Sequence, residues 1–169
     1  MIASVRGKVL CLGDHVDTDQ IYPSRYIEIA DDSQMAKHAL EGIEPTLPGQ
    51  LSRYSLLLGG SNFGCGSSRE HAVRSLKAAG IKILIAESFA RIFFRNAINL
   101  GLPAIHLPST HGIETDHTLS VDLAKGRLMD ETTGSILVFD GFSGFVADIL
   151  SAGGLVEFYK QAEEVTELS

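Results

Sequence analysis

The middle third of the chain alternates apolar runs with helical patterns, and this alternation constrains the fold more than any other feature. Apolar runs at residues 54–58, 81–86 and 104–107 predict three strands. Between them, residues 67–79 and 88–100 carry apolar side chains at helical spacing, and a glycine follows each segment. Strands that alternate with helices pair in parallel through right-handed crossovers, so this region predicts a parallel sheet covered by helices.

The regions on either side predict a mixed sheet. Residues 14–26 carry charge, glycine or proline at nearly every step, which is typical of a surface loop. In the last third, short apolar runs parted by Lys-Gly and Thr-Gly turns predict antiparallel strands. The fold class is therefore α/β, a single domain over residues 1–169 that mixes parallel and antiparallel strands with flanking helices. The remaining predicted strands are 4–12, 119–123, 127–130 and 135–139, and the remaining predicted helices are 33–40, 146–150 and 155–161.

Charge and cysteine content argue against several classes of protein. The net charge is −7 over 169 residues, whereas nucleic-acid surfaces are basic. No apolar run approaches the length of a membrane span, and the N-terminus lacks a signal-peptide pattern. Cys11 and Cys65 are too few for a disulfide framework or a zinc site, and the six histidines lack ligand spacing, so no metal site is expected. We expect a cytoplasmic protein with no nucleic-acid or membrane partner.

A glycine-rich loop followed by Ser67, Ser68 and Arg69 leads directly from a predicted strand into a predicted helix. The first amides of a helix have no partner inside it, and the helix dipole is positive at that end. An arginine can also hold a carboxylate through two hydrogen bonds. This segment therefore predicts a site for an anion.

Two structural readings compete with a catalytic one. Ser67 and Glu70 have the spacing of a capping box, which by itself is the commoner use of such a serine. Glycines at positions 59, 60, 64 and 66 favour a ligand, because they let the backbone approach a bound group and a cap does not need them. The Gly-x-Gly pattern also begins like a dinucleotide fingerprint, which leaves a nucleotide-binding regulatory module as an alternative; Arg69 stands where that fingerprint needs its third glycine.

The chemistry of a catalytic Ser67 is also open at this point. The residues around it do not form a nucleophile elbow, so a hydrolase triad is disfavoured, and His71 is better read as structural. A general base acting on a carboxylate substrate needs strong electrostatic stabilisation of the serine oxygen. Loop amides and the helix terminus supply a field of the right sign.

Three segments together carry a resemblance to a known family: residues 17–19, 62–71 and 87–96. In these motifs the chain resembles the small subunits of 3-isopropylmalate dehydratase, in the aconitase superfamily, from about residue 4 to residue 159. The resemblance implies the swivelling β/β/α domain of aconitases and a hydro-lyase of leucine biosynthesis that acts on a small dicarboxylate. It also implies a large subunit that binds a 4Fe–4S cluster through three cysteines, in a heterodimer or heterotetramer, with no cofactor in this chain.

The resemblance assigns roles to five residues. Ser67 matches the base that removes the proton beside a carboxylate, Ser68 and Arg69 match substrate-carboxylate ligands, and Thr18 and Asp19 match residues facing the same site. Charge complementarity further suggests that Asp19 holds Arg69 or Ser67.

The resemblance also places substrate selection in the loop after Asp19. Glu28 departs from the family's patterns, and it repels a third carboxylate, which counts against homoaconitate. Ile27 and Ile29 are suitable walls for a branched alkyl group, so 3-isopropylmalate is the leading substrate, with citramalate or dimethylmalate left open. The expected selectivity residues are Tyr22, Arg25, Tyr26, Ile27, Glu28 and Ile29.

Two arginines of the third motif carry two competing assignments. Arg91 and Arg95 share one helix face, and a structural pairing with Glu87 or Asp17 is favoured over a role at the site or at the partner subunit. Asn96 suits a polar cap near the helix end. The isolated chain is also expected to self-associate through apolar surface meant for its partner.

Overall fold

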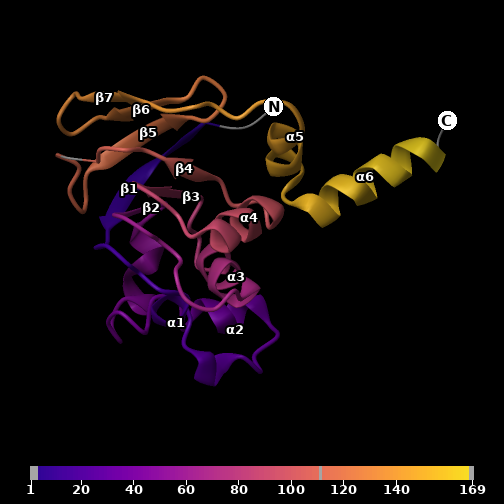
Figure 1. The fold of residues 1–169 in the computed structure, drawn as a ribbon, viewed down its shortest axis with the longest axis horizontal. Helices are drawn as coiled ribbons and strands as arrows, with labels where there is room; N and C mark the ends of the chain where they lie inside the picture. The colour runs from indigo at the N-terminus through magenta and orange to yellow at the C-terminus, as the bar shows by residue number, and fades with distance from the viewer. Residues whose placement is uncertain (1–3, 111, 168–169) are drawn as a thin grey trace.

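The computed structural model describes residues 4–110 and 112–167, and a curled seven-stranded sheet runs through it in the order β4-β3-β2-β1-β5-β6-β7 (Figure 1). The predicted single domain extends to residues 1–3 and 168–169, which lie outside the described residues. The strands are β1 Val5–Cys11, β2 Leu56–Gly59, β3 Ile83–Ala86, β4 Ala104–His106, β5 Thr118–Asp122, β6 Arg127–Asp130 and β7 Ile136–Val138. The helices are α1 Thr18–Ile21, α2 Asp32–Ala36, α3 Glu70–Ala78, α4 Arg91–Asn99, α5 Gly144–Ala152 and α6 Leu155–Glu167, with 3₁₀ turns at Ser24–Tyr26 and Pro48–Arg53.

Strands β1 to β4 form the parallel half of the sheet; the sequence predicts this pairing for β2 to β4, and the structure adds β1 beside β2. Their side chains are apolar on both faces: Leu57 and Leu84 face the helices, and Leu56 and Ile83 face the opposite core. A strand that is buried on both faces reads as a continuous apolar run, which is why these segments were recognisable from sequence.

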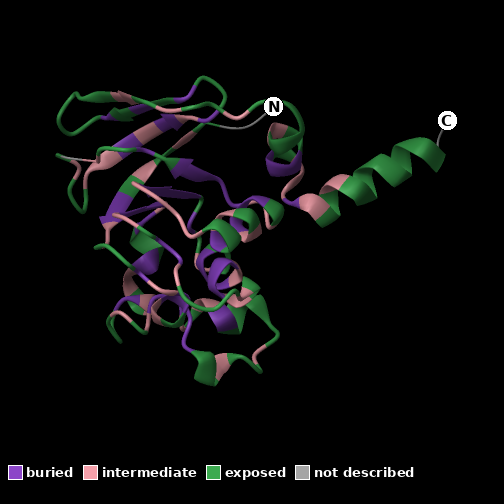
Figure 2. Ribbon diagram, in the orientation of Figure 1, coloured by how far each residue is buried: buried purple, intermediate pink, exposed green. Residues whose placement is uncertain are grey.

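Strands β5 to β7 are antiparallel, and β5 pairs with the outer edge of β1. The sheet curls so that Leu119, Val121 and Leu128 pack against the face of the parallel half that carries no helices. The result is two apolar cores, one between the parallel strands and helices α1 to α4 and one between the two halves of the sheet (Figure 2).

Both central helices begin later than the sequence predicts. Residues 88–90 lie alongside the glycine-rich loop instead, where the Ala90 amide donates to the Phe63 carbonyl (2.9 Å) and the Phe63 amide to the Ser88 carbonyl (2.9 Å). Since a chain paired in this way is extended, α4 starts only at Arg91. The predicted loop 14–26 likewise contains a short helix and a 3₁₀ turn.

The last helix, α6, extends away from the rest of the molecule (Figure 1). It is longer than the predicted helix 155–161 and contains no buried residue in its described part. Within the described ranges, no helix has the length and apolar character needed to cross a membrane.

Candidate functional site

The early loop lies against the glycine-rich loop and is joined to it mainly through the backbone. The Gly64 amide donates to the Val16 carbonyl (2.7 Å), and the Thr18 amide donates to the Cys65 carbonyl (2.8 Å). The buried Thr18 hydroxyl donates to the Ser67 carbonyl (2.8 Å). Thr18 therefore holds the backbone of residue 67 while the side chain of Ser67 stays exposed.

Glycine is required at two points of this loop. Gly64 and Gly66 have φ angles of 81° and 93°, in the left-handed region that side chains disfavour. A Cβ at Gly64 would also overlap the ring of Phe93. Gly59 and Gly60 have a different reason, because a Cβ there would overlap side chains of this chain. These contacts account for Gly59 and Gly60 without a ligand.

Helix α3 has no side-chain cap, so the predicted capping box is wrong. Its N-cap residue is Arg69, with an extended backbone (φ −128°), and no side chain accepts from the first turn. Ser67 lies two residues before the N-cap, and its own carbonyl is bound by the Thr18 hydroxyl. The first amides of α3 are left without an internal partner, and they carry the positive end of the helix dipole.

A cavity of about 210 Å³ lies between this loop and α4. No acidic residue occurs among the described residues that line it, and two arginines do, so the charge of its lining favours an anion. Ser67 is exposed directly before two of the lining residues. The lining residues are Thr18, Gly64, Gly66, Ser68 and Arg69 from the loops, and Ala90, Arg91, Ile92, Phe93 and Asn96 from α4 and the residue before it.

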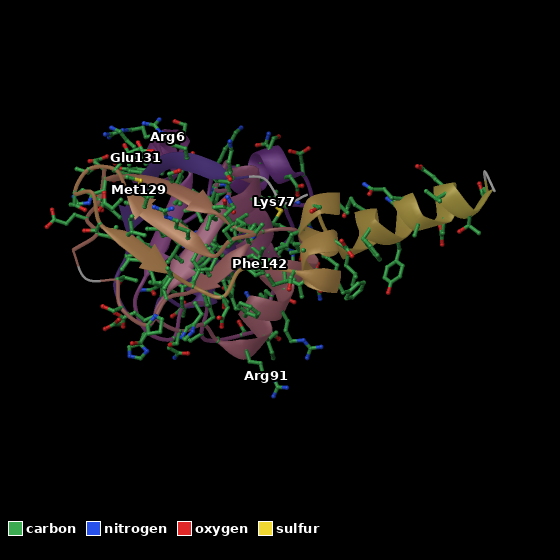
Figure 3. All side chains as sticks on the ribbon, turned by 90° about the horizontal axis from the view of Figure 1, so that it is seen from above. Arg6, Lys77, Arg91, Met129, Glu131 and Phe142 are labelled. Carbon is green, nitrogen blue, oxygen red and sulfur yellow. The ribbon has the colours of Figure 1, made fainter. Side chains whose placement is uncertain are left out.

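The predicted structural pairing of Arg91 and Arg95 is wrong. Neither guanidinium forms an ion pair within residues 4–110 and 112–167. Figure 3 shows the Arg91 side chain at the start of α4, pointing away from the body of the molecule. Asn96 lines the cavity, and the C-cap of α4 is Leu100. Sequence reasoning disfavoured a place at the site for Arg91 and assigned Asn96 to a cap, although the third family motif contains both.

Asp19 has a different partner from the expected one. Its carboxylate accepts a hydrogen bond from the Ser24 amide (2.8 Å), and in the part of the chain that the structure describes it makes no bond to Arg69 or Ser67. Asp19 is exposed beside Thr18, so it fixes the start of the next turn.

Glu41 is the anchor of the predicted selectivity loop. Its carboxylate accepts from the Tyr26 hydroxyl (2.6 Å) and the Arg25 guanidinium (2.7 Å), and it contacts Nδ1 of His38 (2.6 Å). The Tyr26 and His38 rings also stack, with centroids 3.6 Å apart. Burial alone would raise the pKa of Glu41, but these hydrogen bonds outweigh it and lower the pKa to about 2.

Most other side chains of this loop are also engaged by the protein. Tyr22 is buried, its hydroxyl donates to the Tyr26 carbonyl (2.7 Å), and its ring stacks on His71. Ile29 packs against the helix-side core. Of the six predicted selectivity residues, Ile27 and Glu28 are the two that are exposed and whose side chains make no bond in the described structure.

The chain does not fit an iron–sulfur cluster. It contains two cysteines, whereas a cluster with one open iron needs three thiolates. Burial raises the pKa of the Cys11 thiol, and this thiol donates to the Ile113 carbonyl (3.7 Å). In the described residues, no three histidine, cysteine or acidic side chains are grouped so as to hold a metal ion.

Comparisons with known proteins agree with this geometry. A family model described as the aconitase C-terminal domain matches residues 34–110. The chain is 45% identical over 158 residues to "3-isopropylmalate dehydratase small subunit 1" of Methanopyrus kandleri, covering 93% of each chain. It is 42% identical over 162 residues to "isopropylmalate/citramalate isomerase small subunit" of Methanocaldococcus jannaschii, covering 95% of this chain and 96% of the relative. The crystal structure of 3-isopropylmalate dehydratase (LeuD) from M. jannaschii superposes with a TM-score of 0.92 at 38% identity, over 98% of both chains.

Proposed function

The chain belongs to the family of 3-isopropylmalate dehydratase small subunits, and we propose that it serves as the small subunit of a hydro-lyase that interconverts 2-isopropylmalate and 3-isopropylmalate in leucine biosynthesis. The observation that carries this proposal is the Ser67-Ser68-Arg69 segment. Its side chains make no bond within the described structure, whereas Thr18 holds its backbone. The segment lies next to an uncapped helix terminus and a cationic cavity. The reaction removes water across two neighbouring carbons and adds it back in the opposite sense.

Ser67 is proposed as the base. It takes a proton from the carbon beside a substrate carboxylate, and the bonding pair of that C–H bond becomes part of the new double bond as the hydroxyl leaves the neighbouring carbon. A serine oxygen is basic enough only where its anion is stabilised, and each pKa unit corresponds to about 1.4 kcal/mol. The uncapped amides of α3 and the Arg69 guanidinium supply charge of the right sign.

Arg69 and Ser68 are proposed to hold the substrate. Both line the cavity, and the side chain of neither has a hydrogen-bond or ion-pair partner within the described structure, so both side chains are available to a carboxylate. A planar guanidinium binds a carboxylate through two parallel hydrogen bonds and so fixes its orientation. Thr18 is proposed to act by positioning the Ser67 backbone, and Asp19 by holding the turn that opens the selectivity loop.

A large subunit is proposed to complete the site, as a heterodimer or heterotetramer. The names of the relatives call them small subunits, which implies such a partner. Since this chain lacks the thiolates for a 4Fe–4S cluster, we assign the cluster to the large subunit. When bound there, it acts as a Lewis acid on the leaving hydroxyl. We place the enzyme in the cytoplasm and treat residues 1–169 as one swivelling domain.

The selectivity loop is proposed to accept isopropylmalate, with a second alkylmalate as a further candidate substrate. Ile27 offers an exposed apolar side chain, and Glu28 disfavours a third carboxylate, so the loop suits an alkyl group. The M. jannaschii relative is named for both isopropylmalate and citramalate, which favours citramalate as the second candidate.

The proposal is tested by reconstituting the chain with its cognate large subunit and assaying dehydration of both isopropylmalates. The wild-type pair is expected to be active, and Ser67→Ala to lose roughly a thousandfold or more in kcat, because a positioned general base contributes about 10²–10⁴. Ser151→Ala, at an exposed serine of α5, is the matched control and should keep full activity. Near wild-type turnover in Ser67→Ala would assign this chain a purely structural role.

A further inference from the structure

The direction of α6 is set by the body of the protein. The Lys77 ammonium donates to the Gly153 carbonyl (3.0 Å) and to the Leu100 carbonyl (2.7 Å), which ties the start of α6 to the ends of α3 and α4. The rings of Phe145 on α5 and Phe158 on α6 meet edge to face, 5.3 Å apart. The helix therefore leaves the molecule at a fixed angle (Figure 1).

The outer part of α6 is an amphipathic helix whose apolar face is not covered by this chain. Val156 and Tyr159 are 60% and 54% exposed, and Ala162, three residues further along the helix, is also exposed. A free helix of this length is only marginally stable in water, so it needs a packing surface. Residues 155–167 contain four glutamates and one lysine, so a surface that packs against this helix should be basic.

A surface of this kind exists on the same chain, and we name it the α4 trough. It consists of two adjoining cavities of about 570 Å³ and 510 Å³ that share Phe94, Arg95 and His106. Its walls are largely apolar. Arg91 and Arg95 supply positive charge and have no ion-pair partner in the described residues, while Asp140 is the one acidic residue among the described lining residues.

We propose that the α4 trough of one copy receives α6 of a second copy, and that reciprocal exchange gives a two-fold symmetric dimer of the small subunit. The chemistry of the two surfaces matches, since an acidic apolar helix meets a basic apolar groove. Exchange in both directions closes the assembly at two copies and covers both helices.

Pairing of α6 with α6 of the second copy is the weaker alternative. It would bring two acidic helices together, and like charges at close range oppose association. Occupation of the trough by its own α6 conflicts with the Lys77 and Phe145 contacts, which direct the helix away from the body.

The test is the molar mass of the purified full chain over a concentration series, by light scattering or sedimentation. The wild type is expected to be a dimer. Arg95→Glu in the trough, and Glu163→Lys with Glu167→Lys on α6, should each raise the dimer dissociation constant by roughly tenfold or more, because each places like charges in both contacts. Arg127→Glu, an equal charge change on the distant strand β6, is the control and should leave the constant unchanged.

Mixing the two variants gives the decisive result. In a mixed dimer the reversed helix meets the reversed trough, and the native helix meets the native trough, so the mixture should recover wild-type affinity while each variant alone does not. Circular dichroism and thermal unfolding check that each variant is folded. A wild-type chain that stays monomeric, an Arg95→Glu variant that dimerises normally, or a mixture without recovery would each overturn the proposal.

Discussion

Two loops border the proposed active site, and they hold their side chains in opposite ways. In residues 64–69 the backbone is fixed by Val16 and Thr18, and the side chains of Ser67, Ser68 and Arg69 make no bond within the described structure. In residues 22–29 several side chains themselves hold the loop in place, by hydrogen bonds to Glu41 and by packing against the helix-side core.

If the proposed roles hold, the difference separates the residues for chemistry from the residues for selection within one fold. A catalytic loop positioned through its backbone leaves its polar groups free for substrate without losing its shape. A selectivity loop that is held by its own side chains keeps only a few free ones, here Ile27 and Glu28. Changes in the first loop should therefore alter catalysis with little effect on stability, and changes in the second loop should affect both.

After Ser67, the largest effect in this comparison is expected at Arg69. Arg69→Ala, in the reconstituted enzyme, should raise KM by roughly a hundredfold or more and lower kcat/KM further, because a carboxylate would lose its charged partner. Arg69→Lys should recover only part of this loss, since an ammonium cannot bind through two parallel bonds. Steady-state kinetics measure both effects. Arg127→Ala is the control, and an unchanged KM in Arg69→Ala would remove this residue from substrate binding.

A smaller effect is expected from Thr18→Val, which keeps the shape of the buried side chain and deletes its bond to the Ser67 carbonyl. A loss of about 1.5 kcal/mol in positioning corresponds to a roughly tenfold lower kcat. Thr118→Val on β5 is the matched control. If Thr18→Val loses stability but keeps kcat, the loop is not positioned through this bond.

The third effect concerns the anchor of the selectivity loop. Glu41→Gln keeps an acceptor but removes the charge. The free energy of unfolding should therefore fall by about 1 kcal/mol at neutral pH, and the melting temperature by a few degrees. The pKa of Glu41 is lowered to about 2 in the folded protein, so its contribution is present above the usual pKa and is lost as the pH falls toward 2.

The difference in stability between wild type and Glu41→Gln should therefore shrink between about pH 4.5 and pH 2. Thermal melts over this range measure it. Glu44→Gln, at an exposed residue of the same segment, is the control. A difference that stays constant with pH would show that the charge of Glu41 does not hold the loop.

The smallest effect is expected at Glu28. Glu28→Arg should shift the ratio of kcat/KM values by about fivefold from an alkylmalate toward a tricarboxylate, since the exchange replaces repulsion by attraction worth about 1 kcal/mol at an exposed position. Competition assays with isopropylmalate and homoaconitate measure the ratio. An unchanged ratio would remove Glu28 from substrate selection.

Sequence pattern was sufficient for the strands and for the family. The apolar runs predicted the parallel strands β2 to β4, and the glycine turns predicted the antiparallel strands β5 to β7. The order of motifs identified the family, which the comparisons confirm. The apolar runs and turns each lie within a few neighbouring residues, and the motifs are contiguous stretches in a fixed order, so a sequence displays these signals directly.

Helix starts and hydrogen-bond partners were decided by tertiary structure. The spacing of Ser67 and Glu70 predicted a cap, yet Thr18, far away in the sequence, binds the Ser67 carbonyl and delays α3. Asp19 and Arg91 were assigned partners by charge alone, although exposed charges pair according to which backbone brings them together. The sequence thus determined which chemical groups are present and which strands form. The packing of one loop against another determined which of those groups are left free for substrate, because hydrogen bonds between distant segments leave no pattern in either segment by itself.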